Sequence, residues 1–169
     1  PPLTLPFYST ASLPVSISAR DALSVTSYTR QSTAASLPKS TSFSSNQGLV
    51  TLGTIAASKD TVNVSAPGAT GSSIGIADLS TANSVSVFSS GGDITVGRID
   101  TTSGTGSVSL TASSSIGAVK AQADGVALEV TSGSTISVSG KTIGAAGFAN
   151  PLDMAGSTIT LTSTGAAGG

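Results

Sequence analysis

Two short apolar motifs recur in phase along this 169-residue chain, and this repeat constrains the fold more than any other feature. The first motif is a simple alternation, apolar–x–apolar, with copies at Val15/Ile17, Phe43 (a weaker copy), Val62/Val64, Val85/Val87, Val108/Leu110, Leu128/Val130 and Ile159/Leu161. The second motif, apolar–x–apolar–x–x–apolar, follows most copies of the first at Leu23/Val25/Tyr28, Val50/Leu52/Ile55, Ile74/Ile76/Leu79, Ile94/Val96/Ile99, Ile116/Ala118/Ala121 and, with an insertion, Ile136/Val138/Ile143. Because the alternation has a period of two, each motif predicts a β-strand with one buried face.

The length of the repeat decides how these strands are connected. A typical repeat of 20–23 residues holds two or three strands and leaves no room for a crossover helix, which needs about ten residues or more. Strands at this period, with Gly, Ser and Asn turns between them, are typical of a β-solenoid whose coils stack in parallel sheets. The sequence therefore predicts an all-β fold, a parallel β-helix of six to seven coils. A β-sandwich with short, regularly spaced strands is the alternative, although it does not require two motifs in phase.

Polar residues fill the remaining positions of the repeat. Ser and Thr supply about a third of the chain, and small β-compatible residues are expected on the outer surface of the coils. The expected outward positions include Ser86, Thr95, Ser109, Ser137 and Thr160. Residues 89–92 and 102–106 are rich in Ser and Gly, so we expect their glycines to provide positive-φ turns at the coil corners.

The composition excludes most catalytic chemistry. The chain has no His and no Cys, so it lacks the residues of a Ser-His-Asp or Cys-His nucleophile, the usual zinc or haem ligands and any disulfide. Only 9% of residues are charged, and seven Lys and Arg offer no basic footprint for nucleic acid. No run of about 18 apolar residues predicts a membrane span. We therefore predict no catalytic residue, no cofactor-binding residue and no metal site.

The repeat also suggests how the chain is organised. We expect residues 1–14, which are rich in Pro and aromatic residues, to be irregular or the remnant of a preceding coil, and residues 15–169 to form the repeat domain. Loops are expected at about residues 30–42 and 144–157, the second being a small apolar flap with Phe148, Leu152 and Met154. The last motif copy opens a coil that TSTGAAGG does not finish, so further coils or another copy are expected to stack end to end there.

Three segments resemble the repeats of filamentous-haemagglutinin-like exoproteins, which are large bacterial adhesins secreted by the two-partner route. The segments are VSISARDALSV, SGGDITVGRIDTTSG and STISVSGKTIG, and the likeness covers roughly residues 15–164. Asp21 and Asp93 lie where that family often has an aspartate before its second strand. The family's Asn-Pro-Asn secretion signature is absent, since residues 149–152 read only Ala-Asn-Pro-Leu. The resemblance implies a right-handed parallel β-helix and a segment of the shaft rather than the secretion domain.

Carboxylates are the remaining candidates for chemistry, because many β-helices act on polysaccharides. Hydrolysis of a glycosidic bond needs two acids about 5 to 9.5 Å apart on one face. Asp78 and Asp100 flank the second-motif residues of successive coils and are the best pair, with Arg98 the nearby cation. The other acids are Asp21, Asp60, Asp93, Asp124, Glu129 and Asp153. We expect all of these to be solvated corner residues rather than catalytic groups.

Three further ligand types receive little support from the sequence. The calcium-binding nonapeptide repeat is approached only once, at Gly91-Gly92-Asp93, and one occurrence cannot build a stacked site. An ice-binding array would need repeated Thr-x-Thr ladders, whereas the outward positions vary among Ser, Thr, Gly, Asn and Glu. Asn63-Val64-Ser65 is a single glycosylation sequon.

The function that we expect is therefore structural. The chain is predicted to be a non-enzymatic segment of an extracellular or cell-surface bacterial adhesin, a rigid rod that contacts a host cell, a neighbouring cell or a matrix glycan. The absence of Cys agrees with export of a long unfolded chain through an oxidising periplasm. The alternative is a carbohydrate-active enzyme that uses Asp78 and Asp100, or a carbohydrate-binding phage fibre.

Overall fold

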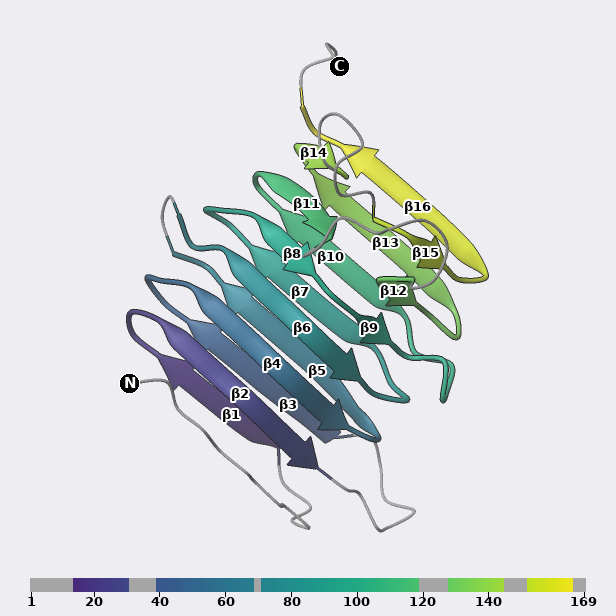
Figure 1. The fold of residues 1–169 in the computed structure, drawn as a ribbon, viewed down its shortest axis with the longest axis horizontal. Helices are drawn as coiled ribbons and strands as arrows, with labels where there is room; N and C mark the ends of the chain where they lie inside the picture. Colours follow the sequence, from purple (N-terminus) through teal and green to yellow (C-terminus); the bar gives the residue numbers. More distant parts are fainter. Residues whose placement is uncertain (1–13, 31–38, 69–70, 119–127, 145–151, 166–169) are drawn as a thin grey trace.

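The chain folds into a β-solenoid of parallel strands (Figure 1). The computed structural model describes residues 14–30, 39–68, 71–118, 128–144 and 152–165. These residues form sixteen strands and no helix, so the predicted all-β solenoid is confirmed. In this described part, accordingly, no helix is long and apolar enough to cross a membrane.

The first sheet contains seven parallel strands that follow one another along the solenoid axis. In order, the strands are β1 (Val15–Ala19), β3 (Lys39–Ser45), β5 (Asp60–Ala66), β7 (Val85–Ser89), β10 (Val108–Ala112), β13 (Thr135–Gly140) and β16 (Thr158–Ser163). Each strand contributes one copy of the short alternating motif. Strands from successive turns therefore lie side by side from the N-terminal end to the C-terminal end (Figure 1).

The second sheet contains nine strands, because the second motif forms one long strand in each of its first three copies and two short strands in each later copy. The strands are β2 (Leu23–Arg30), β4 (Val50–Ala57), β6 (Ile74–Ser80), β8 (Ile94–Val96), β9 (Ile99–Asp100), β11 (Ser115–Ala118), β12 (Val130–Thr131), β14 (Thr142–Ile143) and β15 (Met154–Ala155). β6 pairs with both β8 and β9. The two short strands of one motif copy therefore lie side by side with the single long strand of the preceding copy.

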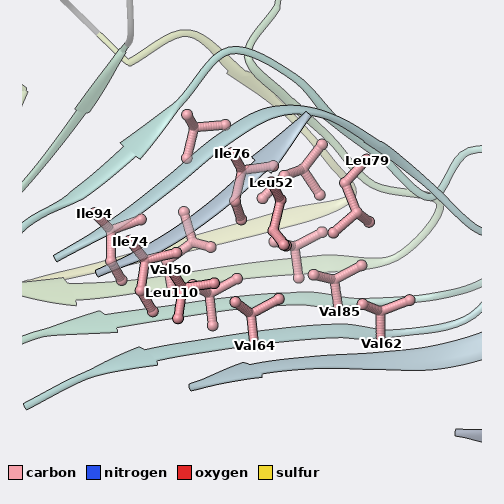
Figure 2. Packing of buried hydrophobic residues seen from close by; sticks show 14 of the residues in the cluster. Val50, Leu52, Val62, Val64, Ile74, Ile76, Leu79, Val85, Ile94 and Leu110 are labelled. Atoms are coloured by element: carbon pink, nitrogen blue, oxygen red, sulfur yellow. The ribbon is translucent and has the colours of Figure 1, made fainter. Parts of the chain in front are cut away.

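The core lies between the two sheets and consists of stacked apolar columns. One column of the first sheet runs through Ile17, Phe43, Val64, Val87, Leu110, Val138 and Leu161. Figure 2 shows first-sheet residues such as Val62, Val64 and Val85 facing second-sheet residues such as Ile76 and Leu79. All five of these side chains are buried. Each turn thus buries its apolar side chains against its neighbours, which is how a solenoid obtains its stability.

The number of turns is about five, so the predicted six to seven coils is slightly too high. A count of motif copies overestimates the turns because β16 opens a turn that no described strand completes. The turn before it also has little second-sheet structure, since its strands β14 and β15 have only two residues each.

Two motif copies near the C-terminal end lie in the opposite sheet to the one that the repeat predicts. Val130 lies in β12 of the second sheet and pairs with Ile99. Ile136 and Val138 belong instead to the first sheet and pair with β10. The segment between β11 and β12 is long, so the last apolar residue of this copy of the second motif is Val130 and not Ala121. The alternation that follows it, at Ile136 and Val138, therefore belongs to the first motif.

The predicted loops coincide only partly with gaps between strands. Arg30 ends β2 and Lys39 begins β3, so the described residues at both ends of the 30–42 segment are strand. Met154, expected in an apolar flap, lies in β15 and continues a core column of the second sheet by pairing with Val130. Leu152, two residues before Met154, is buried as part of the core. The irregular segment 1–14 lies outside the described residues except for Pro14, and Phe148 also lies outside them.

Glycine serves a different purpose from the one that we expected. Among the described glycines, φ is positive only at Gly71 (95°) and Gly144 (77°), so the prediction for segments 89–92 and 102–106 is wrong. A Cβ on Gly53 would instead lie 2.1 Å from the carbonyl oxygen of Thr26 in the preceding turn, and one on Gly104 would lie 2.1 Å from that of Ala82. Glycine is therefore required here because successive turns approach so closely.

We predict that Gly53→Ala lowers the free energy of unfolding by about 1–3 kcal/mol, the usual cost of overpacking. Gly75→Ala is the matched control, because a Cβ there meets only the Thr95 hydroxyl at 3.5 Å. That control is expected to stay within about 0.5 kcal/mol of the parent chain in urea unfolding. Equal effects of the two substitutions would show that the approach of Thr26 to Gly53 does not limit stability.

Candidate functional site

The outer face of the first sheet carries two rows of side chains that are small and polar except for Phe88, and we call this surface the hydroxyl face. One row consists of Ser16, Ser42, Asn63, Ser86, Ser109, Ser137 and Thr160, and the other of Ser18, Ser44, Ser65, Phe88, Thr111, Ser139 and Thr162. All of them are half-buried or exposed. Because the strands are parallel and in register, residues within a row repeat about every 4.8 Å.

The hydroxyl face is more uniform than the sequence suggested. The variation that we predicted for outward positions came from treating both sheets together, whereas Gly and Glu are absent from these two rows. Each serine or threonine hydroxyl can both donate and accept a hydrogen bond. The face therefore offers a regular, uncharged array that suits a ligand rich in hydroxyl groups.

Phe88 interrupts the array near its middle. Its side chain is 43% exposed although it belongs to a large apolar residue. It lies between Ser65 and Thr111 in its row, with Ser86 two positions earlier on the same strand. An aromatic ring among hydroxyls supplies one flat apolar surface beside polar hydrogen-bonding groups. This combination fits the C–H face and the hydroxyl groups of a sugar ring.

The predicted acid pair is brought together, but by an arginine that lies between the two carboxylates. Arg98 Nη1 donates to Asp78 Oδ1 at 3.1 Å, and its Nη2 donates to Asp100 Oδ2 at 2.5 Å. The other oxygen of Asp100 accepts hydrogen bonds from the Thr102 backbone N–H at 2.8 Å and the Thr102 hydroxyl at 2.6 Å. Asp78 and Arg98 are nearly half exposed, so this ion-pair cluster is solvated.

The environment of Asp100 favours its ionised form. Partial burial raises the pKa of Asp100, but the hydrogen bonds from Thr102 and Thr131 and the charge of Arg98 together lower it below the ordinary value of 3.8. A general acid for glycosidic-bond cleavage needs a raised pKa so that it carries a proton near neutral pH. Asp100 is therefore better suited to its ion pair with Arg98 than to the role of a general acid.

A shallow groove of about 550 Å³ runs beside this cluster along the outer face of the second sheet. Its base is one register column formed by Thr29, Ala56, Ser80 and Asp100 from four successive turns. Lys59 also lines the groove. The groove thus carries hydroxyl groups, one carboxylate and two cationic residues, of which Arg30 is buried. It is a second surface on which a polar chain could lie parallel to the axis.

The other acidic residues divide into exposed and buried positions. Asp21, Asp93 and Asp153 are exposed, as expected for corner residues, whereas Asp60 and Glu129 are buried, which contradicts that expectation. Asp124 lies outside the described residues. No group of three or more Asp and Glu in the described part of the chain could hold a metal ion. Asn63 of the sequon is half-buried on the hydroxyl face.

Asp93 and Asp100 are expected to make the protein sensitive to acid. Hydrogen bonds from the Ser114 side chain and the Ser115 backbone N–H lower the pKa of Asp93, which partial burial raises by less. A lowered folded pKa means that the stabilisation is complete above the unfolded value near 3.8 and is lost as the pH falls through the folded value. In thermal unfolding followed below pH 4, Asp93→Asn should therefore reduce the dependence of the unfolding midpoint on pH, because it removes the carboxylate that accepts the Ser115 N–H. Asp21→Asn, at another exposed aspartate, is the control.

A buried polar network near the N-terminal end was not predicted. Arg30 Nη1 donates to Asp60 Oδ2 at 2.7 Å, and the Thr41 hydroxyl donates to the same oxygen at 2.6 Å. The Tyr28 hydroxyl lies 3.2 Å from that of Thr41, and its ring meets Phe43 edge to face at 5.4 Å between centroids. All of these side chains are at most 2% exposed. The available sequence signal was the position of Arg30 and Asp60 at inward places of the alternation.

Comparison of the chain with protein-family models, with curated proteins and with solved structures gives no match.

Proposed function

We propose that this chain is a segment of the shaft of an extracellular bacterial adhesin, a rigid rod that presents the hydroxyl face to a glycan on a cell or in a matrix. The observation that carries the proposal is the continuous register of the first sheet over seven strands. That register places the outward side chains in two rows that follow the solenoid axis. The resemblance of the repeats to filamentous-haemagglutinin-like exoproteins supports the extracellular, non-enzymatic reading.

The rod gains its stiffness from the way in which consecutive turns are joined. Each turn hydrogen-bonds to the turn before and after it, and each core column packs from turn to turn. Stability in such a molecule is a sum of turn and neighbour terms, so the same structure serves at any length. A shaft that must hold an adhesive face away from a cell requires this property.

The experiment that tests this proposal measures binding of the purified chain to immobilised polysaccharides and to whole cells. Phe88→Ala is expected to weaken glycan binding about tenfold, because the ring stacks on a sugar and is not part of the core. Leu49→Ala is the matched control, since Leu49 is 50% exposed but lies at a corner outside the hydroxyl face. Equal loss in both variants, or no binding by the parent chain to any surface, would contradict the proposal.

The second candidate is a carbohydrate-active enzyme. It is favoured by one observation, the position of Asp100 at the groove and its link through Arg98 to Asp78. Release of reducing sugar from a polysaccharide panel, abolished by Asp78→Asn, would favour this enzyme over the rod. We expect no release, because the Asp100 carboxylate is held ionised by its neighbours.

A further inference from the structure

The groove on the outer face of the second sheet has the size and direction of a site for an extended ligand. Its volume of about 550 Å³ lies within the range of small-ligand sites in proteins, about 300–1,000 Å³. Its base is formed by one residue from each of four successive turns, Thr29, Ala56, Ser80 and Asp100. Since neighbouring strands lie about 4.8 Å apart, this base extends roughly 14 Å along the solenoid axis. The small side chains of Ala56 and Ala82, which both line the groove, leave room for a ligand.

Hydroxyl groups make up most of the polar lining of this groove. They belong to Thr29, Ser58, Ser80, Thr81 and Ser103. Thr81 is buried, and its hydroxyl already donates to two backbone carbonyl oxygens. In the described part of the chain, by contrast, the hydroxyl groups of Thr29, Ser80 and Ser103 have no hydrogen-bond partner, and all three residues reach solvent. Each of these three hydroxyls can therefore both donate to a ligand and accept from it.

Lys59 gives the groove one positive charge that no described carboxylate neutralises. The guanidinium of Arg30 is paired with Asp60 at 2.7 Å, and Asp100 is bonded to Arg98 at 2.5 Å. Lys59 is exposed in the turn between β4 and β5 and forms no ion pair with the described residues. Asp100 lies two strands further along the sheet, in β9. A complementary ligand thus carries a carboxylate near Lys59 and hydroxyl donors near Asp100.

We propose that the groove binds a uronic-acid oligosaccharide whose chain lies parallel to the solenoid axis. A carboxylate of the ligand pairs with Lys59, and its ring hydroxyls bond to the groove hydroxyls and donate to Asp100. A sugar ring presents several hydroxyl groups to such a lining, whereas each residue of an acidic peptide presents one backbone donor. This site goes beyond the proposed function, because it lies on the outer face of the second sheet and not on the hydroxyl face.

Titration of the isotope-labelled chain with an oligomannuronate, followed by NMR, locates the ligand. The backbone amide signals of Lys59, Ser80 and Ser103 are expected to shift, and those of Ser109 and Ser137 on the hydroxyl face are expected to stay. The neutral control is the oligomannose of the same length and linkage, which has a hydroxymethyl group in place of each carboxylate and should bind more weakly. Shifts confined to the hydroxyl face, or equal affinity for the two sugars, would overturn the proposed site.

The charge at the groove is tested by Lys59→Gln. This variant should weaken the binding of oligomannuronate about fivefold, the usual effect of removing one exposed charge pair, and Lys59→Arg should retain the binding. Lys141→Gln is the matched control, because Lys141 is also exposed but does not line the groove. Equal weakening by Lys59→Gln and Lys141→Gln would mean that net charge alone attracts the ligand, and it would overturn the site.

The shape of the groove is tested by Ala56→Trp, which places a large ring on its base. We expect this variant to abolish the binding of oligomannuronate, whereas Thr51→Trp, on the outer side of the same strand but outside the groove, should retain it. Circular dichroism and urea unfolding show whether both variants fold. Unchanged binding by a folded Ala56→Trp would overturn the site, and if that variant does not fold, the exposed Lys59→Gln decides the question.

Two comparisons separate this site from other ligands and from the proposed function. Oligoglutamate of equal charge represents an acidic peptide, and tighter binding of it than of oligomannuronate would overturn the assignment to a sugar. Phe88→Ala should leave the affinity for oligomannuronate unchanged, since Phe88 lies on the hydroxyl face. Loss of that affinity in Phe88→Ala would overturn the groove site. Oligomannuronate binding that depends on Lys59, without any effect of Phe88→Ala on other glycans or cells, would overturn the adhesive hydroxyl face and support the groove.

Discussion

Replacing Asp60 by alanine is expected to lower the free energy of unfolding by about 3–5 kcal/mol, because the Arg30 guanidinium then loses its buried counter-charge. Both side chains are 2% exposed, and the ion pair has an Nη1–Oδ2 distance of 2.7 Å. The substitution also removes the acceptor of the Thr41 hydroxyl, which would leave a buried donor without that bond. Urea unfolding followed by circular dichroism measures the loss.

A double-mutant cycle distinguishes the charge pair from a simple packing defect. Arg30→Met/Asp60→Leu replaces both charges by apolar groups of similar size, and it should recover most of the stability lost in either single variant. The surface pair Arg98 and Asp78 is the control, since its exposed geometry predicts a coupling of about 1 kcal/mol or less. Additive single effects at Arg30 and Asp60 would contradict a coupled buried pair.

The fold could be predicted from the sequence because it follows from two patterns that can be read there, the alternation within a strand and the repeat of that alternation in the next turn. The alternation at Val85 and Val87 identifies the buried face of a strand, and the same alternation 23 residues later, at Val108 and Leu110, identifies its neighbour. These two patterns are enough to predict which strands of a solenoid stack on each other and in which register. The prediction went wrong at Val130 and Ile136, where a long insertion moves a motif away from its expected position.

The candidate surface could not be predicted as fully, because it depends on which outward residues share a row. Phe88 is only two residues from Ser86 in the sequence, yet its neighbours in the row are Ser65 and Thr111, which belong to other turns. A shift of register by one residue would send each of these side chains to the opposite face. The Arg30–Asp60 pair was missed for the same reason, since thirty residues separate its partners.

Truncation of the first-sheet core is expected to depend strongly on position along the axis. Leu110→Ala should lower the free energy of unfolding by about 2–5 kcal/mol, because Leu110 is fully buried between Val87 and Val138. Leu161→Ala removes the same atoms from the same column at β16, the last described strand of the sheet. Because Leu161 is 54% exposed, its substitution should cost about 1 kcal/mol or less.

Urea unfolding of the two variants beside the parent chain measures this difference. Because the two substitutions remove the same atoms from one column, the difference between their costs reports the burial of the side chain at each position. Equal losses of unfolding free energy for Leu110→Ala and Leu161→Ala would contradict the expected dependence on position.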